Sequence, residues 1–207
     1  MKAYFVRHGQ SIFNQEERHQ FPDTPLSDTG LMQAKAIASR FTNIPLELIV
    51  ASPFTRALQT AQAIEKIKSV PLIQNSLLVE RKLPTAYRGQ LHSDPELQKI
   101  RTIINEHIDD PLWHFSDEEN FADLHLRAKS ALKLISSQKE QSIAVVTHGY
   151  FLTLMITCIL FDENLTAQLF KSFRSHITYA NTGLTMCEYV EGKWRLLTWN
   201  DYAHLGD

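Results

Sequence analysis

The sequence predicts an α/β fold: a three-layer sandwich with a mostly parallel central sheet and helices on both of its faces. Three short runs rich in β-branched and aromatic residues, 3–6, 46–50 and 142–146, have the composition of buried parallel strands. Each run is followed by apolar residues at helical spacing, and this alternation of strands and helices is typical of an α/β sandwich. The 207 residues fit one domain, covering 1–207.

The helices are predicted from their apolar faces and their starting residues. Ser27 is the expected N-cap of the helix after the first strand, and Leu31, Ala34, Ala38 and Phe41 have the spacing of one face of this helix. After the second strand, Ser52 is expected as a cap and Pro53 as the first helical residue. Two further helices are predicted, one with an apolar face over 121–135 and one that is apolar throughout over 150–161.

Two segments depart from the strand and helix alternation. Residues 184–189 and 194–199 are separated by a turn-like stretch and predict a hairpin at one edge of the sheet. Residues 81–119 carry prolines and many charges, with a helical pattern only over 97–108, so we expect an insertion over the carboxyl ends of the strands. The polar and aromatic segment 200–204 receives no role from the sequence.

Composition excludes several classes of protein. The chain has 21 Lys and Arg against 23 Asp and Glu, and no basic stripe, which argues against nucleic acid as a partner. The longest apolar stretch, 150–161, is shorter than the ~20 residues that cross a bilayer, so no membrane association is expected. Cys158 and Cys187 lie in apolar surroundings, which predicts reduced core thiols and a cytoplasmic location.

Arginines and histidines follow the predicted strands at the points where the strands end. Arg7, His8 and Gly9 follow the first strand, Arg56 comes shortly after the second, and His148 and Gly149 follow the third. Because the carboxyl ends of parallel strands meet at one edge of a sheet, we expect these side chains to converge there. One guanidinium group can donate two parallel hydrogen bonds to two phosphoryl oxygens. No metal-ligating cluster of carboxylates or thiols accompanies these arginines and histidines. The pattern predicts a phosphate site that requires no metal.

The turn after the first strand is expected to direct two neighbouring side chains into one pocket. In a regular strand Arg7 and His8 would point to opposite faces, so we expect Gly9 to adopt a positive φ and bend the chain. The backbone N–H groups of Gln10 and Ser11 are then expected to face the phosphate.

A nucleophile and a proton carrier complete the predicted chemistry. A neutral His8 imidazole is nucleophilic at one nitrogen when the other donates its proton to a backbone carbonyl. Glu80 is the candidate acid and base. Its neighbours Arg81 and Lys82 favour the ionised carboxylate, whereas burial and phosphate charge favour the protonated one, and Glu119 is the reserve candidate.

These segments together resemble the histidine phosphatase superfamily, the phosphoglycerate mutase-like proteins. The matching residues run in order over nearly the whole chain: 7–9, 23–27, Gly30, 33–34, 52–61, Glu80 and 147–149. The resemblance implies a phosphohistidine at His8, phosphate clamping by Arg7, Arg56 and His148, and proton transfer by Glu80.

Substrate contacts are expected from a second group of residues: Gly9, Ser11, Asn14, Arg81 and Gly149. Asn14 matches a family position near the phosphate, with turn hydrogen bonding as its alternative role. Arg81, Lys82 and Arg88 could meet a second anionic group of a substrate or could be solvated surface charges. The cofactor-dependent mutases of the family carry a Gly-rich segment where this chain has 82–88, and this difference favours a phosphatase over a mutase.

The sequence thus predicts a metal-independent hydrolase without a cofactor, acting on a small phosphorylated metabolite, with phosphoproteins as a second choice. The insertion 81–119 contains five Lys or Arg and eight Asp or Glu, so a highly anionic substrate is not indicated. A phosphoglycerate mutase-type phosphomutase and a non-catalytic phosphate-binding or signalling module remain as alternatives. The sequence predicts no oligomeric state.

Overall fold

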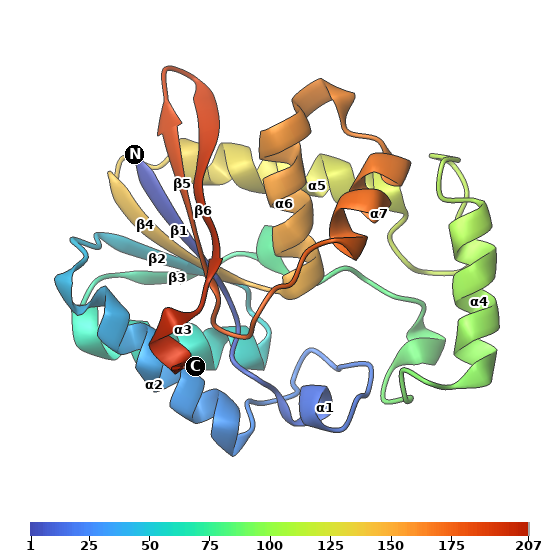
Figure 1. The fold of residues 1–207 in the computed structure, drawn as a ribbon, viewed down its shortest axis with the longest axis horizontal. Coiled ribbons are helices and arrows are strands. Elements are labelled where there is room, and N and C mark those ends of the chain that lie inside the picture. The colour runs from blue at the N-terminus through green and yellow to red at the C-terminus, as the bar shows by residue number, and fades with distance from the viewer. Residues whose placement is uncertain (207) are drawn as a thin grey trace.

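The computed structural model describes residues 1–206, and its centre is a six-stranded sheet in the order β3-β2-β4-β1-β5-β6 (Figure 1). The strands are β1 (Lys2–Arg7), β2 (Leu48–Ala51), β3 (Leu72–Gln74), β4 (Ser142–Thr147), β5 (Leu184–Val190) and β6 (Lys193–Asp201). The first four strands of that order are mutually parallel, while β5 runs antiparallel to β1 and β6 antiparallel to β5. The predicted mostly parallel sheet and the edge hairpin are both present.

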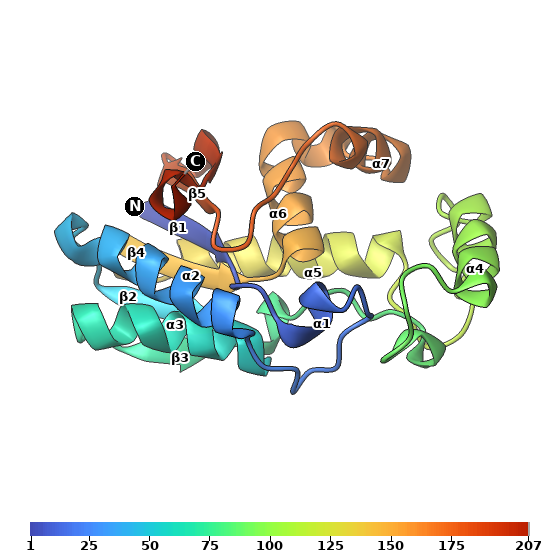
Figure 2. The ribbon, with the colours of Figure 1, turned by 60° about the horizontal axis from the view of Figure 1, so that its bottom comes forward.

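Helices cover both faces of the sheet. On one face lie α2 (Asp28–Arg40) and α3 (Thr55–Lys68), and on the other α5 (Phe121–Ser136) and α6 (Gly149–Phe161) (Figures 1 and 2). The remaining helices are short or peripheral: α1 (Ile12–Gln15), α4 (Pro95–Glu106), α7 (Ala167–Ser175) and five single 3-10 turns at Phe41–Asn43, Ser76–Leu78, Thr85–Tyr87, Asp162–Asn164 and Ala203–Leu205. The three-layer sandwich predicted from the sequence is confirmed.

Strand alternation explains why the chain has two cores. In β1, Phe5 packs among the residues of α5 and α6, whereas its neighbour Val6 packs among those of α2 and α3. Val145 and Val146 of β4 divide in the same way, because successive strand side chains point to opposite faces. All four side chains are fully buried, so the sheet contributes to both cores.

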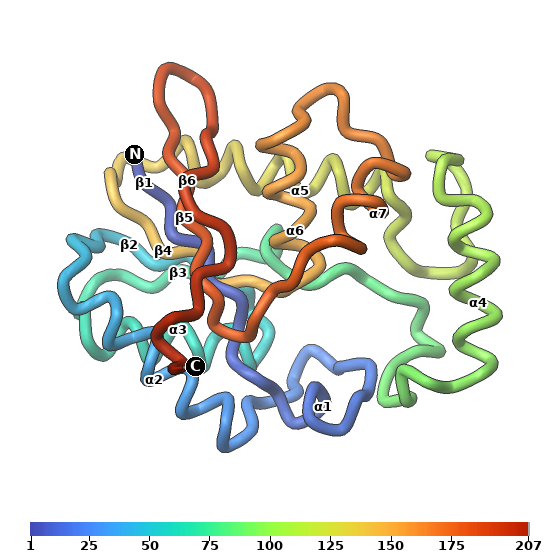
Figure 3. The backbone as a smooth tube through the Cα atoms, viewed as in Figure 1, coloured from blue at the N-terminus to red at the C-terminus, as the bar shows by residue number. Residues whose placement is uncertain are grey.

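The segment 81–119 leaves the sheet region and returns to it. The tube in Figure 3 runs out from the end of the β3 region to α4 and then back to α5. Tyr87 is buried beneath α4 and donates its hydroxyl hydrogen to the Leu97 carbonyl at 3.0 Å. The segment also contacts the loop after α1, since His19 N–H donates to the Gln90 carbonyl at 2.9 Å.

Two details differ from the sequence-based expectations. The short edge strand β3 was not predicted, because its three residues are too few for a clear pattern and two of them are exposed. The predicted start of the helix after the second strand was wrong: α3 begins at Thr55 with Phe54 at its N-cap, and Pro53 precedes it. Ser52 has a different function, described below.

Candidate active site

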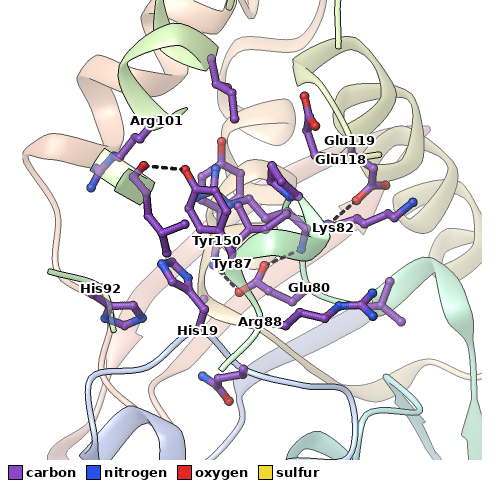
Figure 4. A pocket seen from close by; sticks show the side chains of 18 of the residues that line it. His19, Glu80, Lys82, Tyr87, Arg88, His92, Arg101, Glu118, Glu119 and Tyr150 are labelled. Atoms are coloured by element: carbon purple, nitrogen blue, oxygen red, sulfur yellow. Dashed lines mark hydrogen bonds between the residues drawn. The ribbon is translucent and has the colours of Figure 1, made fainter. Parts of the chain in front are cut away.

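The carboxyl ends of β1, β2 and β4 open onto a cavity of about 700 Å³. Its lining includes seven of the ten predicted catalytic and phosphate-binding residues, namely Arg7, His8, Asn14, Arg56, Glu80, Arg81 and Gly149, whereas Gly9, Ser11 and His148 are not part of the lining. The opposite wall comes from the segment 81–119 and from α7. Figure 4 shows part of this lining, with Glu80 and Tyr150 near its centre and with Tyr87, Lys82 and Glu119 contributed by the segment 81–119. The predicted convergence at one sheet edge is present.

His8 is held in one orientation by two polar neighbours. Its Nδ1 lies 2.6 Å from the Gly9 carbonyl oxygen, so Nδ1 carries the hydrogen and donates it. Arg56 Nε–H donates to Nε2 of the same ring at 3.3 Å, which requires an unprotonated Nε2. Burial, together with the charges of Arg56 and Arg7, lowers the pKa of His8 well below 6.5. The neutral imidazole therefore keeps a lone pair on Nε2.

Arg56 is buried and Arg7 is half-buried, and each donates to a backbone carbonyl that fixes its position. Arg7 Nη1 donates to the Tyr179 carbonyl at 2.7 Å, and Arg56 Nη1 donates to the Phe21 carbonyl at 3.0 Å. Burial lowers the pKa of both groups, that of Arg56 to about 10, so both remain charged at neutral pH. Nε of Arg7 is buried and finds no hydrogen-bond partner within residues 1–206. A phosphoryl oxygen would satisfy this donor.

His148 lies directly behind His8, with 5.1 Å between the ring centroids. The side chain is fully buried, and its Nε2 is 2.8 Å from Oγ of Ser52. Its Nδ1 is buried and unpaired in the described part of the chain. Burial, with the charges of Arg56 and Arg7, lowers the pKa of His148 well below 6.5. Ser52 thus orients a histidine instead of capping a helix.

The Glu80 side chain lies against the N-terminus of α6. Its carboxylate accepts backbone N–H groups from Arg81 at 2.9 Å, Tyr150 at 3.2 Å and Phe151 at 3.1 Å. The backbone that carries Glu80 is fixed from α5, because Arg127 Nη1 donates to the carbonyls of Leu77 at 3.0 Å and Val79 at 2.8 Å. These contacts hold the carboxylate at the edge of the cavity.

The reserve candidate Glu119 is occupied by another partner. Both of its carboxylate oxygens pair with the Arg127 guanidinium, at 2.6 Å and 2.8 Å, and one of them also accepts the Lys82 N–H. Glu119 therefore completes the support of the Glu80 backbone. The structure favours Glu80 as the proton carrier.

The turn at residues 9–11 is built differently from the expectation. Gly9 has no positive φ; instead a Cβ at Gly9 would lie 2.6 Å from the Gly30 carbonyl oxygen, so the glycine allows β1 and α2 to approach closely. The N–H groups of Gln10 and Ser11 donate to the side chains of Gln33 at 2.8 Å and Asn14 at 3.2 Å. The predicted cradle of backbone N–H groups was wrong.

Sequence reasoning missed several residues that organise the site. Asn181 Nδ2 donates to the His8 carbonyl at 2.9 Å, and the Asn200 Oδ1 accepts the Ala180 N–H at 2.8 Å. Gln20 lines the cavity and accepts the Ser11 hydroxyl at 2.8 Å. None of these residues follows a strand or stands in a recognisable spacing, so only the folded chain brings them to the site.

The assembled groups suit the handling of a phosphoryl group. The guanidiniums of Arg7 and Arg56 and the neutral His8 imidazole line one cavity together with the Glu80 carboxylate, and the fully buried His148 ring packs against His8. Over residues 1–206 there is no group of three His, Cys, Asp or Glu side chains able to hold a metal ion. No helix in the same range is long and apolar enough to span a membrane.

Comparisons with known proteins point to one family. "Probable phosphoglycerate mutase GpmB" of Enterobacter sp. (strain 638) is 28% identical, covering 99% of this chain and 95% of that protein. "Putative phosphoserine phosphatase 2" of Hydrogenobacter thermophilus is 27% identical, covering 98% and 97%. The structure of Bacillus stearothermophilus YhfR superposes with a TM-score of 0.83 at 27% identity, covering 99% of this chain and 98% of YhfR.

The family model for the histidine phosphatase superfamily (branch 1) matches residues 3–202, which include all of the sheet except Lys2 and each polar group described above. The chain belongs to the histidine phosphatase superfamily, branch 1.

Proposed function

We propose that this protein is a phosphomonoester hydrolase that works by double displacement through a phosphohistidine at His8. The observation that carries the proposal is the pair of hydrogen bonds on the His8 ring, Nδ1 to the Gly9 carbonyl and Arg56 Nε to Nε2. Together they fix the tautomer in which Nε2 is the nucleophile, at the wall of a cavity lined with arginines. The substrate is a small phosphorylated metabolite, in keeping with a cavity of about 700 Å³.

In the first step Nε2 of His8 attacks phosphorus and the bond from phosphorus to the ester oxygen breaks. Arg7, Arg56 and His148 surround the phosphoryl oxygens and stabilise their charge in the transition state. The leaving oxygen takes a proton delivered by Glu80, which receives it from the substrate monoanion, since the second pKa of a phosphomonoester is about 6. The products are an alcohol and the phosphohistidine.

In the second step water attacks the phosphohistidine. Glu80 accepts the proton of the attacking water, and the bond from phosphorus to Nε2 breaks. Glu80 then gives this proton to the phosphate dianion, which leaves as the monoanion, so Glu80 is again ionised and His8 is again neutral. The lowered pKa of His8 supports the first step, because Nε2 must be unprotonated before it attacks phosphorus.

The mechanism is tested by trapping the intermediate. Wild-type protein mixed briefly with a ³²P-labelled phosphomonoester and quenched in alkali should carry an acid-labile phosphoryl group on the peptide containing His8. His8→Ala should remove both the label and the turnover. A folded His8→Ala protein with wild-type turnover would refute the proposal.

The proposal also predicts independence from metal ions, because Arg7 and Arg56 supply the positive charge. Hydrolysis of an aryl phosphate should continue in excess chelator, and vanadate, which mimics the five-coordinate transition state, should inhibit it. Complete loss of activity in chelator with recovery on adding Mg²⁺ would contradict the metal-free step.

A phosphomutase is the second candidate. It is favoured by the 28% identity to a relative named as a phosphoglycerate mutase over 99% of this chain. A mutase would return the phosphoryl group to a second hydroxyl of the same molecule, whereas a hydrolase would release it to water. Phosphorus NMR of a reaction with a polyol monophosphate distinguishes the two through the yield of positional isomer against inorganic phosphate.

A further inference from the structure

The cavity is far more cationic than the composition of its outer wall suggests. The segment 81–119 is net acidic, yet four of its five Lys and Arg line the cavity, and only two of its eight acids do. The lining cations of this segment are Arg81, Lys82, Arg88 and Arg101, and the lining acids are Glu118 and Glu119. α7 adds Lys171 and Arg174. The composition of this segment did not indicate a highly anionic substrate, but composition does not describe the lining of the cavity, where the cations of the segment gather.

The carboxylates of the lining are already satisfied by the protein. Glu80 accepts three backbone N–H groups, and Glu118 accepts those of Phe115 and Ser116. Glu119 is paired with Arg127. By contrast, neither Arg81 nor Arg174 has a carboxylate within 4.0 Å among the described residues. The excess of positive charge is thus free to act on a ligand.

Arg81 and Arg174 come together on a single aromatic ring. The Cζ atom of Arg81 lies 4.1 Å from the centroid of the Tyr150 ring, and that of Arg174 lies 4.8 Å from the same centroid. Nε of Arg174 is buried and has no hydrogen-bond partner within the described residues. Two guanidiniums on one ring repel each other, and an anion between them would relieve that repulsion and satisfy the unpaired donor.

This pair adjoins the catalytic carboxylate. Arg81 follows Glu80 in the chain, and Tyr150 donates its N–H to Glu80 Oε2 at 3.2 Å. Lys171 lies one helical turn before Arg174 and also lines the cavity. An anion held here would therefore belong to the same small molecule as the phosphoryl group at His8.

We propose that Arg81 and Arg174, braced by Tyr150, bind a second anionic group of the substrate. The substrate class is a compact phosphomonoester that carries a carboxylate or a second phosphate a few bonds from the ester oxygen. Both anions match the guanidinium fork, which donates two parallel N–H groups. This inference rests on the proposed function, because it assigns the second end of the same substrate.

The test measures binding, so that it does not depend on turnover. His8→Ala protein is titrated by calorimetry with three phosphate esters. Two carry a second anion: the phosphate of 3-hydroxypropanoate and propane-1,3-diol bisphosphate. The third, 3-hydroxypropyl phosphate, has an uncharged hydroxyl at its other end and is the reference. At least one of the two doubly anionic esters should bind 10-fold or more tightly than the reference. The preferred one identifies the second group as a carboxylate or a phosphate.

The residues are tested by substitution in the same protein. Arg174→Met and, separately, Arg81→Met should reduce the ratio of the two affinities to nearly 1. Each should change the affinity for the reference ester, 3-hydroxypropyl phosphate, less than threefold. Arg101→Met, which removes a lining guanidinium that does not stack on Tyr150, should keep the preference. Circular dichroism checks the fold of each variant.

Three results would overturn the inference: no preference in the His8→Ala protein, a preference that survives both substitutions, or an equal loss in Arg101→Met. The proposed function is judged separately, by release of phosphate from an aryl phosphate by the wild-type protein and by labelling of His8. Hydrolysis without any preference among the three esters would leave the function standing and reject the second anion site.

Discussion

The two histidines of the site, His8 and His148, are held in the neutral form by their surroundings. The Gly9 carbonyl fixes the hydrogen of His8 on Nδ1, and Arg56 donates to Nε2. Burial lowers the pKa of His8 and of His148 well below 6.5, so neither ring carries a charge at neutral pH. In the mechanism proposed above, the proton that the reaction moves is therefore carried by Glu80 and not by a histidine.

Glu80→Gln tests this assignment at the level of one residue. If Glu80 protonates the leaving oxygen, the substitution should slow phosphoryl transfer from alkyl phosphates by about 10²-fold or more, the usual scale of general acid–base catalysis. Esters of a good leaving group such as nitrophenol need little protonation, so their first step should slow much less. The phosphohistidine should accumulate, because water attack lacks its base; rapid-quench kinetics measures both effects.

The positioning alternative has a distinct result. Gln at position 80 keeps one carbonyl oxygen in place of Oε1, which accepts the N–H groups of Arg81 and Phe151, and loses only the acceptor of the Tyr150 N–H, so most of the local contacts should persist. Equal slowing of both kinds of ester, without accumulation of phosphohistidine, would assign Glu80 a positioning role only. Glu119→Gln would then be the next substitution to examine.

At the scale of elements, the strands and their flanking helices could be predicted from sequence, but the supports of the site could not. Strand ends are marked locally, by apolar runs that stop at Arg7, His148 or the residues before Ser52. The contacts of Asn181 with His8 and of Arg127 with Val79 join residues far apart in the chain, and no local pattern encodes them. Long-range hydrogen bonds of this kind follow from the fold alone.

The segment 200–204, to which the sequence assigned no role, contributes one of these supports through Asn200. The segment 179–183 wraps the end of β1: the Tyr179 carbonyl accepts from Arg7, and Asn181 donates to the His8 carbonyl. Asn200 anchors this segment through its Oδ1, which accepts the Ala180 N–H. Asn200 itself is buried with a φ of 49°, a left-handed conformation that Asn tolerates better than most residues.

Asn200→Ala should therefore weaken both stability and turnover. The loss of a buried acceptor and the strain of a left-handed Ala should cost about 1–3 kcal/mol in the free energy of unfolding. Loosening of 179–183 should lower kcat more than it changes KM for an aryl phosphate. Asn200→Asp keeps an acceptor for the Ala180 N–H and should recover most of kcat, whereas equal kcat in Asn200→Ala and the wild type would show that the anchor does not matter for catalysis.

At the scale of the whole molecule, the site lies at the end of a strand whose two faces pack into different hydrophobic cores. Phe5 and Val6 pack on opposite faces of the sheet, and β1 continues directly into Arg7 and His8. The strand therefore carries Arg7 and His8 directly to the site, and the same packing buries His8 beside hydrophobic residues. Such burial couples the protonation of the site to the stability of the fold.

The free energy of unfolding should consequently fall as the pH drops below 6.5. In the unfolded chain His8 and His148 regain pKa values near 6.5 and take up protons, whereas in the folded protein their lowered pKa values keep them neutral. Because the unfolded state then binds more protons, each histidine should contribute about 1 kcal/mol of lost stability per pH unit, down to its lowered pKa, and nothing above pH 6.5. Urea unfolding at pH 7.5, 6.5, 6.0 and 5.5 measures this slope. His148→Gln should show a slope smaller by about one proton between pH 6 and 5.5, and a slope equal to that of the wild type would mean that His148 is not held neutral in the folded state.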